Sequence, residues 1–320
     1  MPDLAAILAD LRVPVVVAPM AGAAGGRLAA AVSAGGGLGM VGVGNVATVD
    51  QVRAECGTAA ESGQRFGIGL MCWSLPQNPA LLDVALESGP TVVSLSFGDP
   101  RPYLDAVHAA GAVVVAQVGT RTEAVDALDA GVDGLVVRGS EGGGHGRGVV
   151  STLPLLQQVL DLTDRTVLAG GGVATARGLA AVLAAGASAA WVGTPFAACA
   201  ESLFRPELKD AVIAADTDQT VYTRVFDIAQ RFDWPEIYGG RALANAFTDR
   251  WAAHPDVLSE SLDDDLTAQI KQARVDADLS LAPVYAGESA GLVDRARTAA
   301  EVLADFEPFR DHLRAAQRWT

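Results

Sequence analysis

The stretch Val132-Asp-Gly-Leu-Val-Val137-Arg-Gly-Ser-Glu-Gly-Gly-Gly-His145-Gly-Arg-Gly148 joins a strand-like apolar run to a glycine-rich loop. Six of the eleven residues from Arg138 to Gly148 are glycine, which adds no side chain to a core and loses much entropy when it is ordered. Glycines in such a loop typically allow positive φ angles or a close approach of the backbone to a ligand. His145 lies among them, and a histidine can act near neutral pH as a general base or pair with an anion. The alternative is a flexible surface loop with an incidental histidine.

Apolar runs like 132–137 recur along the first 200 residues and alternate with alanine-rich helical segments. They are almost continuously apolar, as strands buried on both faces of a parallel sheet should be. We predict eight strands, at residues 13–18, 38–43, 66–71, 91–97, 112–118, 131–137, 166–169 and 188–192. Helices are predicted between them, at residues 27–34, 48–62, 79–88, 102–110, 122–130, 153–162 and 175–185.

Repeated βα units predict a parallel sheet with right-handed crossovers. Eight of them favour an α/β fold of the closed (β/α)8 TIM-barrel type over a doubly wound open sheet. The active site of such a barrel lies in the loops after the carboxyl ends of the strands. The unusual residues cluster there, among them Pro19-Met20-Ala21-Gly22, Cys72-Trp73-Ser74 and the loop with His145.

Glycines also follow the seventh and eighth predicted strands, in Gly170-Gly171-Gly172 and in Gly193-Thr194. Thr175 is a plausible N-cap for the next helix. In these barrels free N–H groups and helix amino ends after strands 7 and 8 commonly bind phosphate. The two glycine sites therefore predict a phosphate pocket, although a single glycine triplet can simply allow a tight turn.

Composition excludes several classes of function. The net charge of −15 and the pI of about 4.6 argue against nucleic acid or an anionic membrane as a partner. Cys56, Cys72 and Cys199 are far apart in the sequence and form neither a disulfide framework nor a zinc motif, so no metal is expected. No stretch has the pattern of a signal peptide or a membrane span. We expect a cytoplasmic protein with a small-molecule substrate, and a homodimer is compatible with this.

Residues 203–320 have a different character. They hold five prolines and most of the tryptophans, and they show no regular βα alternation. Helical periodicity is visible at 262–277 and 291–306. We predict a barrel over residues 1–202 and a helical, substrate-side insertion or lid over 203–320, with the final helices packing back on the barrel. Trp234 and Tyr238 are interpreted as core or lid packing, and the turn at 285–291 either contributes to the site or only begins a helix.

Taken together, the motifs resemble those of the nitronate monooxygenases, which are FMN-dependent (β/α)8 barrels. The pieces that match occur in the same order and span nearly the whole chain. They are residues 18–22, 31–39, the Gly-x-Glu-x-Gly-Gly-His block at 139–145, residues 169–173, 192–194, 201–202, Gly240-Arg241 with Asn245, and 285–287. The histidine block and the Gly-Thr element are specific in combination.

The resemblance implies oxidation of alkyl nitronates by O₂ to a carbonyl compound and nitrite, with FMN as the cofactor. It implies that His145 is the catalytic residue, which pairs with the nitro oxygens or takes the α-proton of a neutral nitroalkane. The phosphate of FMN would be held chiefly at Gly172 and at 191–194. The residues implied for cofactor binding are Pro19, Met20, Ala21, Gly69, Arg138, Gly143, Gly171, Gly172, Trp191, Val192, Gly193 and Thr194.

Three positions depart from the family pattern. Arg138 stands where a flavin-contacting Gln is usual, Gly69 where an Asn is usual, and Gly142 where an Ala is usual. Arg138 ends a predicted strand, so its side chain is expected at the barrel mouth, where its permanent charge would favour negative charge on the flavin. The alternative is that Arg138 turns aside to pair with Glu141 or another acid.

Two rival functions stay open. The nearer is an FMN barrel that takes hydride from NAD(P)H, such as an enoyl-ACP or quinone reductase. Ala18-Pro19-Met20 favours the monooxygenases, because a Gly-Gly-Met form is associated with the reductases. The more distant rival is a phosphate-binding barrel without flavin chemistry, from which a yellow colour of the purified protein would distinguish the flavoenzymes.

Overall fold

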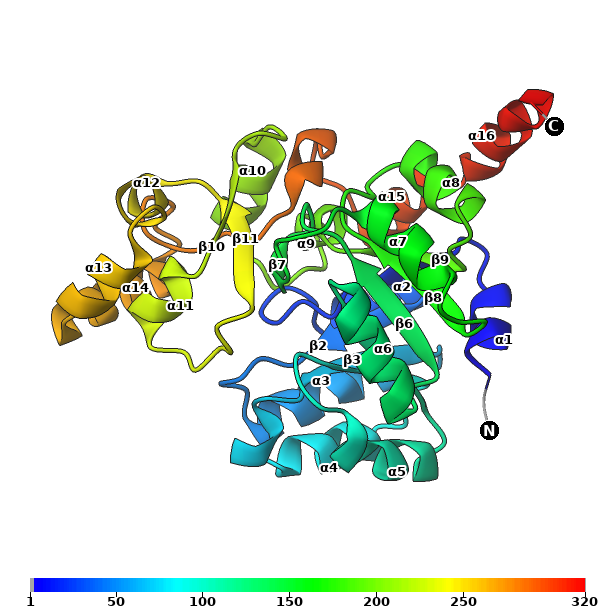
Figure 1. Ribbon diagram of the computed structural model, residues 1–320, viewed down its shortest axis with the longest axis horizontal. Coiled ribbons are helices and arrows are strands. Elements are labelled where there is room, and N and C mark those ends of the chain that lie inside the picture. Colours follow the sequence, from blue (N-terminus) through cyan, green and yellow to red (C-terminus); the bar gives the residue numbers. More distant parts are fainter. Residues whose placement is uncertain (1–2, 320) are drawn as a thin grey trace.

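The computed structural model describes residues 3–319 as a barrel of parallel strands surrounded by helices, with a second region at one end (Figure 1). The strands follow one another around the barrel in the order β1-β9-β8-β6-β5-β4-β3-β2. Their bounds are Val15–Val17 (β1), Gly39–Gly42 (β2), Phe66–Met71 (β3), Val92–Ser96 (β4), Val113–Val118 (β5), Gly134–Arg138 (β6), Thr166–Gly170 (β8) and Ala189–Val192 (β9). The predicted (β/α)8 barrel is confirmed, and the doubly wound alternative is wrong.

Helices cover the outside of this barrel and alternate with its strands. Thr48, Thr120 and Thr175 cap three of them with their side-chain oxygens, which confirms the N-cap predicted at Thr175. The helices of this part of the chain are Leu4–Ala9 (α1), Gly26–Ala34 (α2), Val49–Glu61 (α3), the short 3-10 helix Leu75–Gln77 (η1), Ala80–Glu87 (α4), Arg101–Ala109 (α5), Arg121–Ala130 (α6), Thr152–Leu160 (α7) and Ala176–Ala184 (α8).

Both faces of the barrel strands are buried, which explains their continuous apolar runs. Val16 and Val136 belong to one buried cluster, which fills the interior and includes the apolar side of α1. Their neighbours Val17 and Val137 belong to the larger cluster between the strands and the outer helices. Since side chains alternate along a strand, each run supplies both clusters.

Strand β1 has a full ladder on only one side. It pairs with β9 along its whole length, but it meets the β2 side in one isolated bridge between Val16 and Leu38. There the N–H of Val17 donates to the carbonyl of Leu38 at 2.9 Å, and the N–H of Leu38 donates to the carbonyl of Val15 at 3.0 Å. The barrel is therefore nearly closed, with a weak seam between its first two strands.

The region after β9 contains strands as well as the expected helices. Thr220–Thr223 (β10) and Gly239–Leu243 (β11) pair antiparallel, and β11 also pairs with Gly144–Gly146 (β7), which carries His145. Both strands are short and β11 begins with two glycines, so neither gives a strand pattern in the sequence. The helices here are Thr194–Ala197 (α9), Pro206–Ala214 (α10), Val225–Gln230 (α11), Ala246–Trp251 (α12), Pro255–Ser261 (α13), Asp264–Asp276 (α14) and the 3-10 helix Glu288–Leu292 (η2).

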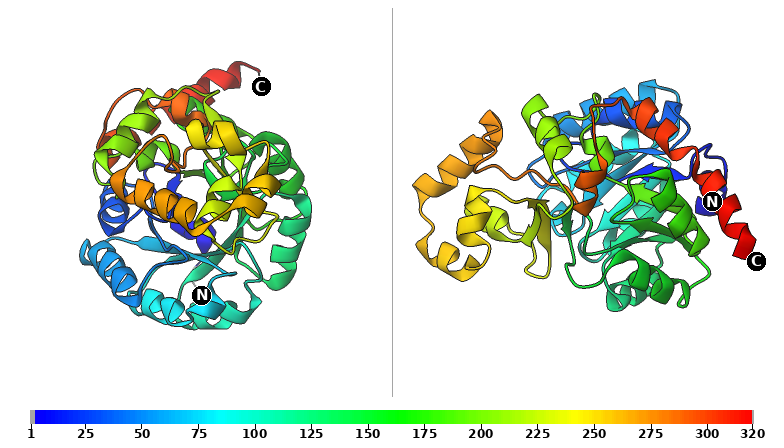
Figure 2. Two further views of the ribbon diagram at one scale, coloured as in Figure 1. Left: turned by 90° about the vertical axis from the view of Figure 1, so that its left-hand side faces the viewer. Right: turned by 90° about the horizontal axis from the view of Figure 1, so that it is seen from above.

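The chain returns to the barrel at its end. Ala299–Phe306 (α15) packs against α2 and α8, and Phe309–Ala316 (α16), followed by the 3-10 turn Gln317–Trp319 (η3), packs against α8. The N–H of Ala200 donates to the carbonyl of Arg297 at 2.9 Å. Residues 201–296 therefore leave the barrel and return to it at one place, and in Figure 2 this region lies over one end of the barrel.

Two kinds of feature are not found within residues 3–319. No helix there is long and apolar enough to cross a membrane. No group of three or more His, Cys, Asp or Glu side chains in the same residues is placed to hold a metal ion. The cysteines at 56, 72 and 199 are buried free thiols.

Candidate active site

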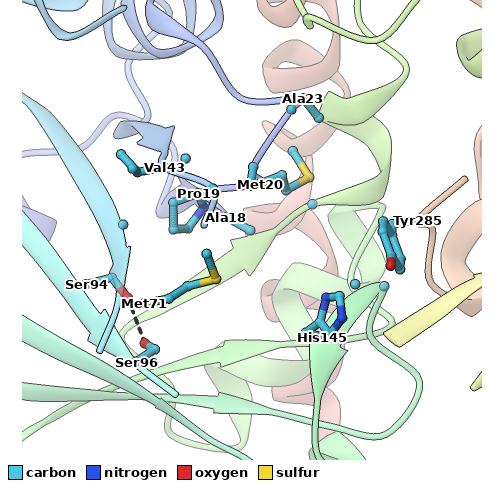
Figure 3. A pocket seen from close by; sticks show the side chains of 18 of the residues that line it. Ala18, Pro19, Met20, Ala23, Val43, Met71, Ser94, Ser96, His145 and Tyr285 are labelled. Carbon is cyan, nitrogen blue, oxygen red and sulfur yellow. Dashed lines mark hydrogen bonds between the residues drawn. The ribbon is translucent and has the colours of Figure 1, made fainter. Parts of the chain in front are cut away.

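A cavity of about 490 Å³ lies at the carboxyl ends of the barrel strands. In Figure 3, His145 and Tyr285 lie on one side of it and Pro19, Met20 and Met71 on the other. The residues proposed from the sequence that line this cavity are Pro19, Met20, Ala21, Gly69, Arg138, Gly143, His145, Gly171, Gly172, Trp191, Gly193 and Thr194. Val192 does not line it, because its side chain is buried between the barrel and the outer helices.

His145 projects from the loop formed by residues 139–148, which we call the histidine loop. Its Nε2 atom lies 2.9 Å from Oδ1 and 3.0 Å from Oδ2 of Asp227. Only 12% of the His145 side chain and 4% of the Asp227 side chain are exposed. A carboxylate can only accept hydrogen bonds, so in the neutral imidazole Nε2 carries the proton. The lone pair of Nδ1 is then available to accept another proton.

The sequence did not reveal Asp227 as a site residue. It lies on α11, 82 residues after His145. Helix α11 begins directly after β10, and the pairing of β10, β11 and β7 brings this carboxylate to the imidazole. The one signal in the sequence is an acidic residue inside the apolar run 225–229, where an unpaired charge would be costly to bury.

Aromatic side chains cover His145. The ring of Trp234 stacks on the imidazole with a centroid distance of 3.8 Å and an interplanar angle of 1°. Phe97 packs edge-on against Trp234 at 5.1 Å and against Tyr238 at 5.3 Å. Phe97 has a φ of 63°, which is strained for a residue other than glycine. Trp234 lines the cavity, so its interpretation as packing alone was incomplete.

Tyr285 also belongs to this aromatic wall. It lies in the turn at 285–291, for which the sequence allowed either a role in the site or only the start of a helix. Its ring centroid lies 5.2 Å from that of His145. A Cβ atom on Gly240 would lie 2.7 Å from Cε1 of Tyr285, so the ring occupies space that glycine leaves free on β11. Burial, and secondarily the charge of Asp227, raises the pKa of Tyr285 well above its usual value. The Tyr285 hydroxyl therefore keeps its proton at neutral pH.

Arg138, the last residue of β6, is 3% exposed and directs its guanidinium group to the histidine loop. The carbonyl oxygens of residues 142–144 accept hydrogen bonds from its Nη2, and that of Arg147 accepts one from its Nη1. None of the ion pairs within residues 3–319 includes Arg138, so the alternative that it pairs with Glu141 or another acid is wrong. The Glu141 carboxylate instead accepts from the N–H of Thr152 at 3.1 Å, at the start of α7.

Gly69 leaves room for a proline. A Cβ atom at this position would lie 2.3 Å from Cγ of Pro19, so no side chain fits here beside it. Polar groups are present on the next strands instead. The hydroxyls of Ser94 and Ser96 lie 3.0 Å apart (Figure 3), and the N–H of Gln117 donates to Ser96 at 2.9 Å. The cavity thus has polar groups on β4 although β3 offers none at Gly69.

Backbone N–H groups that can donate hydrogen bonds also line the cavity. Gly172 has a φ of 71°, which other residues rarely adopt. Gly193 and Thr194 lie at the start of α9, where the first N–H groups of a helix have no acceptor within it. The Ser289 hydroxyl lines the same cavity, and the Thr194 hydroxyl accepts from the N–H of Gly287 at 3.0 Å, which holds η2 against α9. These donors fit the phosphate of a cofactor.

Comparison with known proteins finds a family profile and relatives that match most of this chain. The sequence profile of a family described as nitronate monooxygenase matches residues 76–307. A nitronate monooxygenase of Neurospora crassa is 29% identical, with 95% of this chain and 91% of that protein covered. A (3aS,4S,5R,7aS)-5-hydroxy-7a-methyl-1-oxo-octahydro-1H-indene-4-carboxyl-CoA dehydrogenase of Rhodococcus jostii is 32% identical over 69% of this chain. The chain spans about 62% of the length of that relative.

Two solved structures are similar over nearly the whole chain. FabK of Thermotoga maritima has a TM-score of 0.84 and 28% identity, and all of both chains is covered. A nitroalkane oxidase of Streptomyces ansochromogenes has a TM-score of 0.82 and 28% identity, with 98% of this chain and 99% of that chain covered. The coverage shows that the likeness includes the region after β9 as well as the barrel.

Proposed function

The chain belongs to the nitronate monooxygenase family of flavin-dependent oxidoreductases, and on that premise we propose that it binds FMN and oxidises nitroalkanes and their nitronates. The products are a carbonyl compound and nitrite, and O₂ is the co-substrate. The observation that carries this proposal is one cavity lined both by a histidine–carboxylate pair and by backbone N–H groups that can bind a phosphate.

The residues present fit a phosphate-bearing cofactor. Gly172, Gly193, Thr194 and Ser289 would hold the phosphate through N–H groups and a hydroxyl. The part of the cavity beside Pro19, Met20 and Gly69 would take the ring system. When bound, FMN supplies the acceptor for the electrons of the substrate and passes them on to O₂.

His145 acts on the proton of a neutral nitroalkane. Its Nδ1 takes the proton from the carbon beside the nitro group, and the electron pair of the C–H bond moves onto the nitro group to give the nitronate. The imidazolium that forms donates through Nε2 to Asp227, whose negative charge balances it. A nitronate that is already formed needs no base, and its oxygens accept a hydrogen bond from Nδ1 only when the imidazole is protonated.

The aromatic wall keeps water away from this step. Trp234 covers one face of the imidazole, and Phe97 and Tyr238 pack behind it. Exclusion of water strengthens the hydrogen bond between His145 and Asp227, because the local dielectric is low.

The purified protein tests the proposal directly. We expect it to be yellow, to release FMN on heating, and to form nitrite with uptake of O₂ from both a nitroalkane and its nitronate. A colourless protein that takes up no FMN would contradict the cofactor, and a yellow one that forms no nitrite would contradict the reaction. Rapid bleaching by NADH or NADPH without O₂ would favour the reductase alternative.

A further inference from the structure

We propose that Arg138 is a positioning residue for His145, and that this role requires glycine at position 142. The guanidinium group occupies the space that a side chain at position 142 would need. The link to catalysis rests on the proposed role of His145. The coupling between Arg138 and Gly142 rests on geometry alone.

The guanidinium group of Arg138 binds several carbonyls of the histidine loop at once, whereas Arg241 donates from Nε to one carbonyl of the loop, that of Ser140, at 2.9 Å. Nη2 of Arg138 donates to three consecutive carbonyl oxygens, those of Gly142, of Gly143 at 3.1 Å and of Gly144 at 2.7 Å. Nη1 donates to the carbonyl of Arg147 at 3.4 Å. These bonds fix the backbone on both sides of His145.

The Arg138 side chain has no easy alternative position. It is 3% exposed, and no carboxylate in the described part of the chain forms an ion pair with it. A buried cation without an ion-pair partner depends on the oxygens that solvate it, here the loop carbonyls. Movement of the guanidinium group would leave both the charge and the carbonyls unpaired.

Two glycines make room for this group. A Cβ atom at Gly142 would lie 2.7 Å from Nε of Arg138, and one at Gly146 would lie 2.6 Å from its Nη1. Both distances are shorter than real side-chain contacts allow. An alanine at position 142 would therefore displace the Arg138 side chain from these carbonyls, and this links two of the three departures from the family pattern.

The effect reaches His145 through the backbone. Gly144 and Gly146 flank the histidine on β7, which pairs with β11. Two other side chains bind this backbone at single points, since Nε2 of Gln117 donates to the His145 carbonyl at 3.3 Å and the Tyr222 hydroxyl donates to the Gly146 carbonyl at 2.8 Å. If the arginine is displaced, the imidazole loses its fixed distance to Asp227 and to the substrate.

A cycle of holoenzyme variants tests the coupling: Gly142→Ala, Arg138→Gln and the double variant, with Gly57→Ala as the control. A Cβ atom at Gly57 would meet nothing within 4 Å, so the control should match the wild type. We expect Gly142→Ala to lower kcat for a nitroalkane about 100-fold with little change in KM or FMN content, because misplacement of a reacting group by about 1 Å costs this much. The kcat of the double variant should be at least about tenfold higher than that of Gly142→Ala, since contacting residues couple strongly.

Hydrogen exchange of residues 139–148 gives a readout that does not depend on activity. Exchange should be faster in each single variant and slower again in the double variant. Wild-type kcat and exchange in Gly142→Ala would overturn the proposal, and so would losses that simply multiply in the double variant. If Gly142→Ala does not fold, a folded double variant supports the coupling and an unfolded one overturns it. If the wild type forms no nitrite, the proposed function fails, but the exchange cycle still decides the coupling.

Discussion

At the scale of single residues, the chemistry depends on which nitrogen of His145 carries a proton. Asp227 lies within hydrogen-bond distance of Nε2, so the proton is held there and Nδ1 can act as the base. Under the proposed function, this arrangement would separate two substrates that a simple anion site would treat alike. A neutral nitroalkane needs the base, whereas a nitronate does not.

Replacing His145 by Asn should therefore affect the two substrates differently. We expect kcat/KM for a nitroalkane to fall about 10²–10⁴-fold, the usual contribution of a general base, and kcat/KM for its preformed nitronate to fall much less. Nitrite formation from each substrate measures this, and FMN content serves as the control. Equal losses for both substrates would show that His145 positions or binds them rather than removing a proton.

Asp227→Asn tests the partner of the base. An amide can donate to Nε2, which would move the imidazole proton to Nδ1 and abolish the free lone pair. We expect at least about a 10²-fold loss with the nitroalkane and a small loss with the nitronate. A variant with unchanged nitroalkane kinetics would mean that Asp227 supports the fold and not the proton transfer.

The sequence marked some of these residues and not others. His145 was visible because its loop is rich in glycine, a local signal. Asp227 and Trp234 were not recognised, because each meets His145 only through the pairing of β7 with β11 and the turn of chain after α11. The orientation of Arg138 also depended on carbonyl groups whose positions no residue pattern encodes.

At the scale of elements, the phosphate end of the site depends on the start of α9. A Cβ atom at Gly193 would lie 3.3 Å from Sδ of Met20, which is a contact that a small shift can relieve. We expect Gly193→Ala to keep FMN, because its methyl group is tolerated, and Gly193→Leu to lose most of it, because a larger side chain enters the cavity. Bound FMN per protein, measured by absorbance after gel filtration, checks this. Full occupancy in Gly193→Leu would place the phosphate elsewhere.

The barrel strands and the strands after β9 differed in how well the sequence predicted them. The eight barrel strands were predicted because burial on both faces requires apolar runs with distinct ends. Strands β10 and β11 were missed because both are short and the glycines that begin β11 make room for rings such as that of Tyr285.

At the scale of the whole molecule, the reactivity of the three cysteine thiols measures whether the fold is intact. Burial raises the pKa of Cys56, Cys72 and Cys199 from 9.0 to about 12. At pH 8 the thiolate fraction of each is then on the order of 10⁻⁴, so we expect native protein to resist iodoacetamide while urea-unfolded protein is labelled at all three. Mass spectrometry checks this. Labelling of the native protein would show that a thiol is accessible.

The same shift predicts how stability depends on pH. A thiol with a raised pKa in the folded state is protonated there while the unfolded thiol ionises, so its stabilising contribution is complete below pH 9 and is lost as the pH rises towards about 12. We expect the free energy of unfolding in urea to fall between pH 8 and pH 10 by up to about 1.4 kcal/mol per thiol for each pH unit above 9. A Cys56→Ala variant should show a flatter dependence, and an equally steep one would assign the slope to other groups.

The meeting of Ala200 and Arg297 at one hydrogen bond has a consequence for how this architecture can diversify. Residues 201–296 begin and end at the same place in the structure. Recombination at these two ends, which are close in space but far apart in sequence, can therefore replace the segment without breaking any of the eight barrel strands. Helix α15 would still dock beside α2 and α8. A shortened chain with a tight turn in place of residues 201–296 should fold but lack Asp227 and Trp234. The segment that carries Asp227 and Trp234 can thus be exchanged as one piece without changing the barrel strands.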